Sequence, residues 1–159
     1  MKVGVTGHQA REGIEWSWVE RVVWAELIKS GRIDQAFSSL AAGTDQLFAE
    51  AALHLSIPVT AVIPLEHYEQ FFKGAALADY VRLLALCDRL TLKGPADDPD
   101  KAFFAAGTFI VDSCDLLFAV WDGEPAEGFG GTADIVDYAR RVHRRVLHIN
   151  PITEAVIEI

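Results

Sequence analysis

The sequence predicts an α/β fold: a single doubly wound, mostly parallel sheet with helices on both faces, of the Rossmann-like type. Short β-branched runs alternate with longer amphipathic stretches, and this alternation is typical of parallel sheets with right-handed crossovers. The continuously apolar run Leu116–Trp121 favours a central strand covered on both faces. The 159 residues show no repeat or linker and suffice for one full core, so we expect one domain over residues 1–159.

The first half of the chain is expected to follow the order β-α-β-α-β. Lys2–Thr6 has the apolar, β-branched character of a strand. The stretch Trp16–Ser30 carries apolar residues at helical spacing, and we expect this helix to end at Gly31. The remaining elements of this half are expected to be a strand at Gln35–Leu40, a helix at Thr44–Leu55 and a strand at Pro58–Ile63.

The second half is less regular at first and then returns to the same pattern. Asp134 near the start of Thr132–Val142, and Arg140 and Arg141 near its end, suit the macrodipole of a helix. The other expected elements are a loop with a helical turn at Leu65–Phe72, a helix at Ala75–Cys87, a strand at Arg89–Lys93, an acidic turn at Gly94–Asp100, a helix at Lys101–Cys114, and strands at Leu116–Trp121 and Arg145–Asn150.

The charge of the chain bears on its partners. With 14 basic and 23 acidic side chains, the formal net charge is −9. Nucleic acids and anionic membranes are bound non-specifically by basic surfaces, so we expect no nucleic-acid partner. The lack of a long apolar run likewise predicts no membrane span and no signal peptide. A small anionic ligand stays compatible with this charge, because backbone amides alone can hold a phosphate.

Cysteine, histidine and tryptophan give further expectations. Cys87 and Cys114 are isolated in sequence, which favours buried, reduced thiols in a cytoplasmic protein. No histidine spacing suits a metal, so we expect neither a metal nor a cofactor.

Trp16, Trp18 and Trp24 lie on one predicted helix and cannot all face one core. We expect at least one to be exposed and to mark a homodimer or higher homo-oligomer, unless Trp16 covers the entrance of a cleft.

Glycine and hydroxyl residues follow three of the predicted strands. In a parallel sheet these loops lie at one edge, where ligands bind. Glycine lets a backbone approach a ligand, and the first N–H groups of a helix bind anions. We therefore expect a shared ligand cleft, with ordinary turns and helix caps as the alternative. The predicted ligand-binding residues are Thr6, Gly7, His8, Gly43, Thr44, Asp45, Asp122, Gly123, Gly130, Gly131 and Thr132.

These loops differ from the common nucleotide-binding motifs. The first loop has no GxGxxG, and no GKS or GKT occurs, which argues against a classical NAD dehydrogenase and a P-loop NTPase. His8 can bond a phosphate or a base, while Asp45 and Asp122 can accept from ribose hydroxyls or an amino group. Arg11 is the cation nearest to the first loop, and it either pairs with a phosphate or is solvated.

Three segments, VGVTGHQ, SSLAAGTDQLFAEAAL and DLLFAVWDGEPAEGFGGTADIVDYAR, resemble the SLOG superfamily of Rossmann-like nucleotide-binding proteins. This superfamily includes the DNA-processing protein A family and the "lonely guy" phosphoribohydrolases. The resemblance covers nearly the whole chain and is weakest over residues 65–109. It implies that the loops at Gly7, Gly43–Asp45 and Gly130–Thr132 line a nucleotide or nucleotide-derived ligand, with the phosphate at Gly130–Thr132. Residues 65–109 would then shape the base pocket.

The resemblance leaves open whether the protein is an enzyme. The phosphoribohydrolases carry a glutamate three residues past the motif threonine, where this chain has Ile135 after Thr132. Cleavage of an N-glycosidic bond builds positive charge on the sugar and needs a carboxylate. Asp134 either replaces that glutamate or serves as a first-turn dipole partner. We therefore expect cytoplasmic ligand binding or sensing without chemistry.

Two alternatives remain at this point. The first is an N-glycoside hydrolase or transferase that acts on a nucleoside monophosphate, with Asp134 or Asp122 as its carboxylate. The second is a partner-binding module whose loops have lost their ligand.

Overall fold

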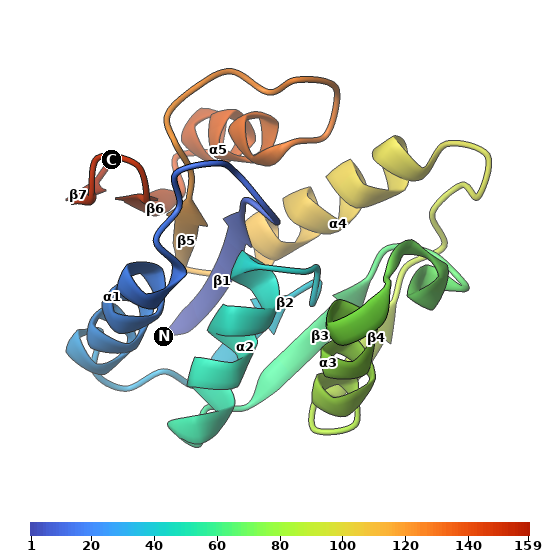
Figure 1. The fold of residues 1–159 in the computed structure, drawn as a ribbon, viewed down its shortest axis with the longest axis horizontal. Coiled ribbons are helices and arrows are strands. Elements are labelled where there is room, and N and C mark those ends of the chain that lie inside the picture. The colour runs from blue at the N-terminus through green and yellow to red at the C-terminus, as the bar shows by residue number, and fades with distance from the viewer.

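The computed structural model describes residues 1–159 and confirms the expected fold class (Figure 1). Its single sheet has seven strands in the order β4-β3-β2-β1-β5-β6-β7. All neighbouring pairs are parallel except β6 and β7. The strands are β1 (Lys2–Gly7), β2 (Gln35–Ser38), β3 (Val59–Ile63), β4 (Asp88–Thr91), β5 (Leu116–Val120), β6 (Arg145–Asn150) and β7 (Ala155–Glu158). The chain moves outward from β1 in one direction and from β5 in the other, so the switch point lies between β1 and β5.

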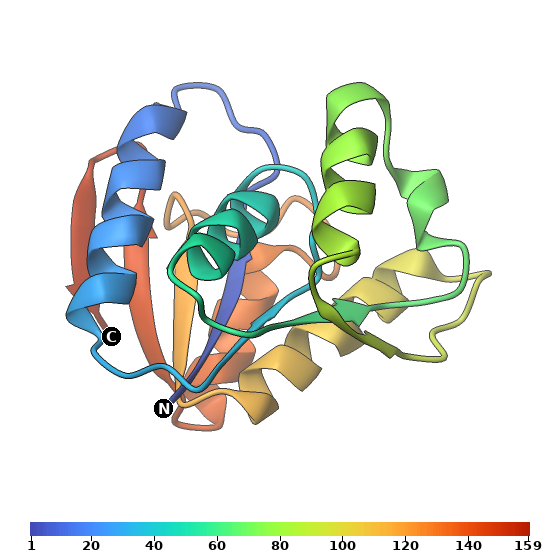
Figure 2. The same cartoon turned by 90° about the horizontal axis from the view of Figure 1, so that it is seen from below.

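Helices cover both faces of the sheet, as Figure 2 shows. The helices α1, α2 and α3 lie on one face, and α4 and α5 pack together on the other. Their bounds are α1 (Trp16–Lys29), α2 (Thr44–His54), α3 (Gly74–Leu84), α4 (Pro99–Ser113) and α5 (Thr132–Arg141), with a short 3₁₀ helix η1 (Tyr68–Phe71) before α3. Each face therefore has its own hydrophobic core.

Strand β5 contributes to both cores, as its continuous apolar sequence predicts. Leu116, Phe118 and Val120 belong to the core under α1 and α2. Leu117 and Ala119 belong to the core under α4 and α5. The register pairs Gly7 at the end of β1 with Val120 at the end of β5. The loops that follow these two strands therefore start side by side at the same edge of the sheet.

One strand was not expected from the sequence. Strand β7 is short and largely exposed, so it lacks the apolar alternation that identifies a half-buried strand. It forms because a tight turn returns the chain onto β6. The side chain of Asn150 closes this turn by accepting from the N–H groups of Ile152 and Thr153. An ion pair of 2.6 Å between Arg145 and Glu158 joins the two strands.

The tryptophans of α1 differ from the prediction. Trp16, Trp18 and Trp24 are all partly buried and pack against the first core. A helix that lies on a sheet and also contacts a second helix covers a broad arc of its own surface, and Trp24 reaches the His54 ring of α2 at 5.8 Å. The exposed tryptophan from which we predicted a homodimer is therefore not found.

Both cysteines are free, with Cys114 buried and Cys87 partly buried. None of the helices has the length and hydropathy needed to cross a membrane.

Candidate functional site

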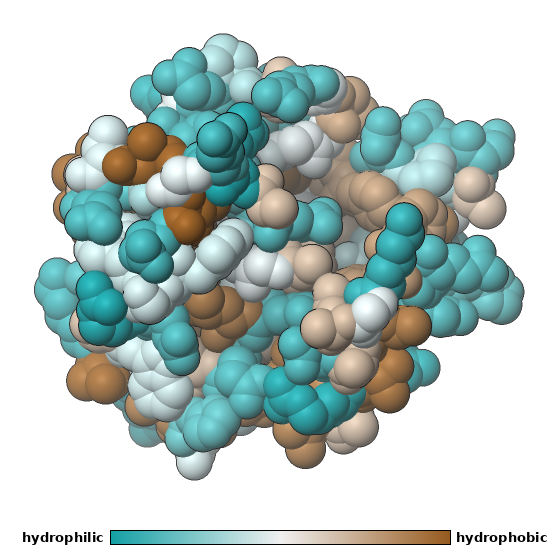
Figure 3. All heavy atoms as spheres, in the orientation of Figure 1, coloured by the Kyte–Doolittle hydropathy of each residue, from teal (hydrophilic) through white to brown (hydrophobic).

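A cleft of about 620 Å³ lies at the carboxyl ends of the strands. The loops after β1, β2, β3 and β5 line it together with one side of α4. Its volume falls within the range of small-molecule sites, and its place beside the switch point is where ligands bind in open α/β sheets. Figure 3 shows the hollow beside the loop that leads into α5, with hydrophobic residues in brown within it.

The three glycine-containing loops all reach this cleft, although not every predicted residue faces it. The lining includes Thr6, Gly7, His8, Asp45, Gly130, Gly131 and Thr132. Gly43, Thr44, Asp122 and Gly123 lie outside the lining. A glycine or threonine pattern in sequence does not reveal whether the residue faces a ligand or a neighbouring loop, and here it marks both.

Gly7, Gly43 and Thr44 join the loop after β1 to the start of α2. The Thr44 hydroxyl donates to the carbonyl oxygen of His8 at 2.8 Å, and the Thr44 N–H donates to the same oxygen at 3.2 Å. A Cβ on Gly7 would lie 2.5 Å from the Thr44 side chain, and one on Gly43 would overlap the Gln9 carbonyl oxygen. These glycines therefore serve close packing, and the polar groups of Thr44 are already used within the protein.

The N-terminus of α5 is open instead. The N–H groups of Gly131, Thr132 and Ala133 have no acceptor within the protein, and all three residues line the cleft. The first N–H groups of a helix carry a partial positive charge and have no intrahelical partner. At the start of α2, by contrast, the N–H groups of Thr44 and Gln46 donate to the carbonyl oxygens of His8 and Ala41, so α5 offers the longer run of free donors.

Asp134 stabilises the loop before α5. Its Oδ2 atom accepts from the N–H of Gly130 at 2.7 Å, and Gly130 has a φ of +87°, a conformation that glycine adopts readily. Asp134 is not among the residues that line the cleft, whereas its neighbour Ile135 lines it and is only 3% exposed. The position at which the resemblance places the phosphoribohydrolase glutamate is therefore occupied by an apolar side chain that packs against Gly107 of α4.

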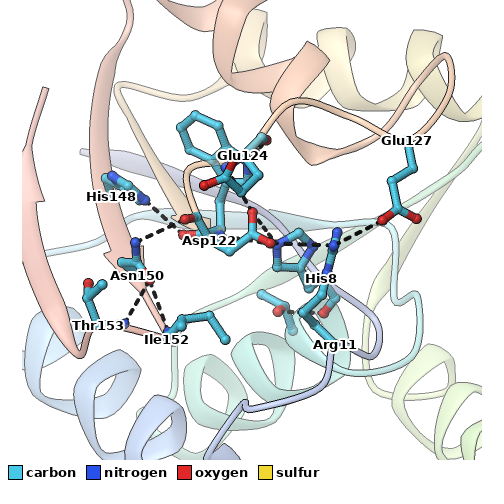
Figure 4. Close-up of polar contacts among 11 residues, drawn as sticks. His8, Arg11, Asp122, Glu124, Glu127, His148, Asn150, Ile152 and Thr153 are labelled. Atoms are coloured by element: carbon cyan, nitrogen blue, oxygen red, sulfur yellow. Dashed lines mark hydrogen bonds and ion pairs between the residues drawn. The ribbon is translucent and has the colours of Figure 1, made fainter.

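His8, Asp122 and Arg11 form a network at the switch point (Figure 4). The Nε2 atom of His8 accepts from the backbone N–H of Asp122 at 3.1 Å, and it lies 3.3 Å from the Asp122 carboxylate. The Nη1 atom of Arg11 lies 3.5 Å from Asp122 and 3.4 Å from Glu127. Arg11 is the only arginine or lysine that lines the cleft, so it supplies the single fixed positive charge there.

The surroundings of this network set the protonation of its members. Burial lowers the pKa of His8, and the charge of Arg11 adds to this effect against the opposing charge of Asp122. A neutral His8 suits its role as the acceptor for the Asp122 N–H. Burial tends to raise the pKa of Asp122, but a hydrogen bond from the Glu124 N–H and the neighbouring His8 and Arg11 outweigh it, so this pKa is lowered.

The lining of the cleft also combines aromatic rings with a buried carboxyl group. Tyr68, Phe71 and Phe103 form its wall, with ring centroids of Phe71 and Phe103 5.1 Å apart. Asp45 is 8% exposed, and burial raises its pKa to about 7 although backbone N–H groups, including that of Ala41 at 3.3 Å, favour its charged form. The sequence placed residues 65–109 near a base but singled out none of these aromatic residues, because isolated aromatics in an irregular stretch carry no periodic signal.

A mostly parallel α/β sheet with a ligand-sized cleft at its switch point defines a Rossmann-like fold, which is the fold that the resemblance to the SLOG superfamily implies. No protein-family model matches the sequence, and no curated protein sequence does. Solved structures are similar to it, and they include DNA processing protein A from Streptococcus pneumoniae. That structure has a TM-score of 0.64 and 25% sequence identity, over 94% of this chain and 50% of the other.

Two further structures share the fold at lower identity. DNA processing protein A from Helicobacter pylori has a TM-score of 0.63 and 16% identity, over 94% of this chain and 65% of the other. The molybdenum cofactor binding protein from Rippkaea orientalis has a TM-score of 0.59 and 14% identity, over 92% and 74%. The chain thus spans about half the length of the S. pneumoniae protein.

These similarities correct one expectation. The acidic net charge led us to exclude a nucleic-acid partner, and that prediction is wrong, because two of the similar structures are DNA processing proteins and the one from H. pylori is described by its single-stranded DNA binding mode. Net charge averages over the whole surface. Strand binding depends on the local groove and on aromatic side chains that stack with bases.

Proposed function

We propose that the cleft binds a nucleotide or a nucleotide-derived ligand, with a phosphate group at the N-terminus of α5. The open N–H groups of Gly131, Thr132 and Ala133 carry this proposal. A phosphate there gains hydrogen bonds from free donors together with the favourable field of the helix. Arg11 lies in the same cleft, and a guanidinium group suits phosphate oxygens.

The charges of the cleft favour a ligand with few phosphates. Apart from Arg11, the ionisable lining residues include the carboxylates of Asp100, Glu124 and Glu127. Like charges repel when they share a site of low dielectric constant. A single phosphate can sit on the helix N-terminus, whereas a triphosphate would extend toward these carboxylates. We therefore favour nucleoside monophosphates, together with ligands such as ADP-ribose, NAD and cyclic nucleotides that have no terminal phosphate group.

Thermal unfolding in the presence of a ligand panel tests this proposal. The panel holds AMP, GMP, ADP-ribose, NAD and cyclic nucleotides, with inorganic phosphate for comparison. A ligand at 100 times its Kd should stabilise the protein by about 2.7 kcal/mol. If none of the panel shifts the unfolding midpoint, the proposal is wrong.

Two substitutions at one position locate the phosphate. Gly131 has a φ of −73°, so other residues can adopt its conformation, and an added Cβ would meet only the Ala126 side chain at 3.2 Å. Gly131→Glu places a carboxylate at the helix N-terminus and should abolish the shift. Gly131→Ala adds bulk without charge and should retain most of it. Equal behaviour of the two variants would contradict a phosphate at this position.

A second candidate function is the binding of single-stranded nucleic acid. The likeness to the two DNA processing proteins favours it. A second ground is Phe129 in the loop before α5, which is 58% exposed and lies beside Phe104 of α4. Exposed aromatic rings stack with bases of any sequence. Fluorescence polarisation with a labelled 20-nucleotide DNA strand, measured at two salt concentrations, tests this candidate.

The two candidate functions, binding of a single strand and binding of a mononucleotide, differ in their dependence on Phe129. If the site binds strands, Phe129→Ala should weaken strand binding by at least about fivefold, since stacking contributes roughly 1–3 kcal/mol per base. Binding to a strand that is no tighter than binding to the matching mononucleotide would contradict this second candidate and favour the first.

A further inference from the structure

Two polar side chains in the cleft are left unused by the proposed phosphate site. Asp45 is 8% exposed and Tyr68 is 5% exposed, and both line the cleft. The Tyr68 hydroxyl has no hydrogen-bond partner within the protein. It is not among the fully buried unpaired atoms, of which Nε of Arg144 is the only one, so the hydroxyl is accessible to solvent. Burial raises the pKa of Tyr68, and the charge of Asp45 adds a smaller contribution in the same direction.

Asp45 also lacks a cationic partner. It takes part in none of the ion pairs of the protein, in contrast to Asp122, which lies beside His8 and Arg11. Its Oδ2 atom accepts from the Ala41 N–H. A buried carboxylate without a cation is costly unless it is well hydrogen-bonded, and it is stabilised by any ligand that offers further N–H donors.

Aromatic rings line the same cleft as this carboxyl group and suit a flat ligand. Phe71 is 49% exposed although its ring packs edge-on against Phe103, with ring centroids 5.1 Å apart. The Phe103 ring also lies 6.1 Å from that of Tyr68. Offset and edge-to-face contacts of this kind hold planar heterocycles. Tyr68, Phe71 and Phe103 therefore offer aromatic surface to a ligand in the same cleft as Asp45.

We propose that the part of the cleft lined by Asp45, Tyr68 and the two phenylalanines recognises a fused heterocycle whose ring N–H adjoins an exocyclic amino group, with the carboxylate of Asp45 accepting from both and the Tyr68 hydroxyl bonding beside them. Guanine and pterins share this 2-amino-4-oxo edge. The inference rests on the proposed function in one respect: the phosphate of a ligand that carries such a ring is expected at the N-terminus of α5.

The donor pattern of the edge sets the specificity. Two adjacent N–H groups match the two oxygens of a carboxylate, as in bidentate charge-assisted pairs. Adenine has a ring nitrogen with a lone pair beside its amino group, so it would direct an acceptor at the carboxylate. A site built for donors discriminates strongly against a ligand that leaves a buried polar group unpaired.

Isothermal titration calorimetry with four ligands tests the inference: GMP, AMP, ribose 5-phosphate and neopterin, a pterin that carries no phosphate. We expect GMP to bind at least tenfold more tightly than AMP. Asp45→Asn, which keeps the shape but adds a donor, should remove this preference and leave the affinity for ribose 5-phosphate unchanged. The matched control Asp79→Asn, at an exposed position of α3 outside the cleft, should keep the preference.

The four ligands separate the failure of this inference from that of the phosphate site. Equal binding of AMP and GMP, with ribose 5-phosphate also bound, overturns the base recognition and supports the phosphate site. Binding of neopterin without ribose 5-phosphate supports the recognised edge, identifies a pterin source and overturns the phosphate site. Binding of none overturns both. If Asp45→Asn does not fold, Tyr68→Phe serves instead. It should weaken GMP about fivefold and AMP much less, since it removes one hydrogen bond, and an unchanged ratio contradicts the inference.

Discussion

The imidazole of His8 accepts a hydrogen bond from the backbone N–H of Asp122 at 3.1 Å, across the switch point of the sheet. The backbone of His8 adds two further links, because its N–H donates to the carbonyl of Val120 and its carbonyl accepts from Thr44. One residue thus fixes the loops after β1 and β5 and the start of α2 relative to one another. A neutral imidazole is required for the link to Asp122.

This requirement predicts how stability changes with acid. The pKa of His8 is lowered in the folded protein, so the unfolded chain binds a proton more readily near its ordinary value of 6.5. The contribution of His8 to stability is therefore present above about pH 6.5 and decreases as the pH falls below it. In urea unfolding, His8→Asn should lose about 1–2 kcal/mol at pH 8, and less at pH 5.5.

A control histidine separates this effect from general acid sensitivity. His143 is exposed and follows α5 in a left-handed conformation, which asparagine tolerates. His143→Asn should leave the unfolding free energy unchanged at both pH values. A loss in His8→Asn that is equal at pH 8 and pH 5.5 would contradict the role given to the neutral ring.

Asp45 should produce the opposite pH dependence. Its pKa is about 7 in the folded protein against an ordinary 3.8, so the folded state binds the proton more tightly. The corresponding stability is full below about pH 4, decreases as the pH rises toward 7, and is lost above it. Asp45→Asn should therefore gain about 2 kcal/mol relative to the native protein on going from pH 5 to pH 8. Urea unfolding at the two pH values measures this difference.

The Asp45 comparison has two safeguards. Taking the difference between variant and native protein cancels the effects of His8 and Asp122, which titrate in both. Asp79→Asn removes a carboxyl group that is half exposed, so its difference from the native protein should not change between pH 5 and pH 8. A constant difference for Asp45→Asn as well would show that this carboxyl group titrates normally.

The sequence predicted the elements that have a strong local signal. The apolar run of β5 and the charged ends of α5 identify both elements, because burial on two faces and the helix dipole act on the residues themselves. Strand β7 was missed, since its pairing depends on β6 and on the turn at Asn150. Helix α3 ends at Leu84 rather than at the expected Cys87, within the usual uncertainty of a helix end that lacks a glycine or proline.

The candidate site could be predicted as a region but not residue by residue. Glycines before two helices indicated one edge of the sheet, and both loops reach the cleft. Whether the first helix turn stays open depends on contacts between residues distant in sequence, such as Thr44 with His8 or Gly43 with Gln9. No local pattern records those contacts. The depth of Asp45 is likewise set by the fold, and its sequence position alone suggested only a favourable first-turn carboxylate.

Two glycines with positive φ angles give a test of loop packing. Gly43 has a φ of +79° and Gly31 one of +74°, so alanine at either position adopts an unfavourable conformation. An added Cβ meets nothing within 4 Å at Gly31, whereas at Gly43 it overlaps the carbonyl oxygen of Gln9. Gly31→Ala should cost about 1 kcal/mol, and Gly43→Ala about 2–3 kcal/mol more. Equal losses in urea unfolding would mean that the two loops separate without cost.

Asp134 distinguishes a structural from a catalytic carboxylate. Asp134→Ala removes the acceptor of the Gly130 N–H, a hydrogen bond of 2.7 Å, and a negative charge from the first turn of α5. We expect a loss of about 1–2 kcal/mol in unfolding free energy, and weaker ligand binding because the loop before α5 is less ordered. Asp137→Ala, on the same helix but beyond its first turn, is the matched control and should cost less.

Base release decides between the two roles of this carboxylate. Native protein incubated at high concentration with nucleoside monophosphates should release no free base, measured by chromatography, since Ile135 occupies the place of the phosphoribohydrolase glutamate and Asp134 is bonded to its own loop. Release by the native protein that Asp134→Asn abolishes would instead identify an N-glycosidase, because asparagine retains the acceptor for Gly130 but cannot carry the charge that the sugar cation requires.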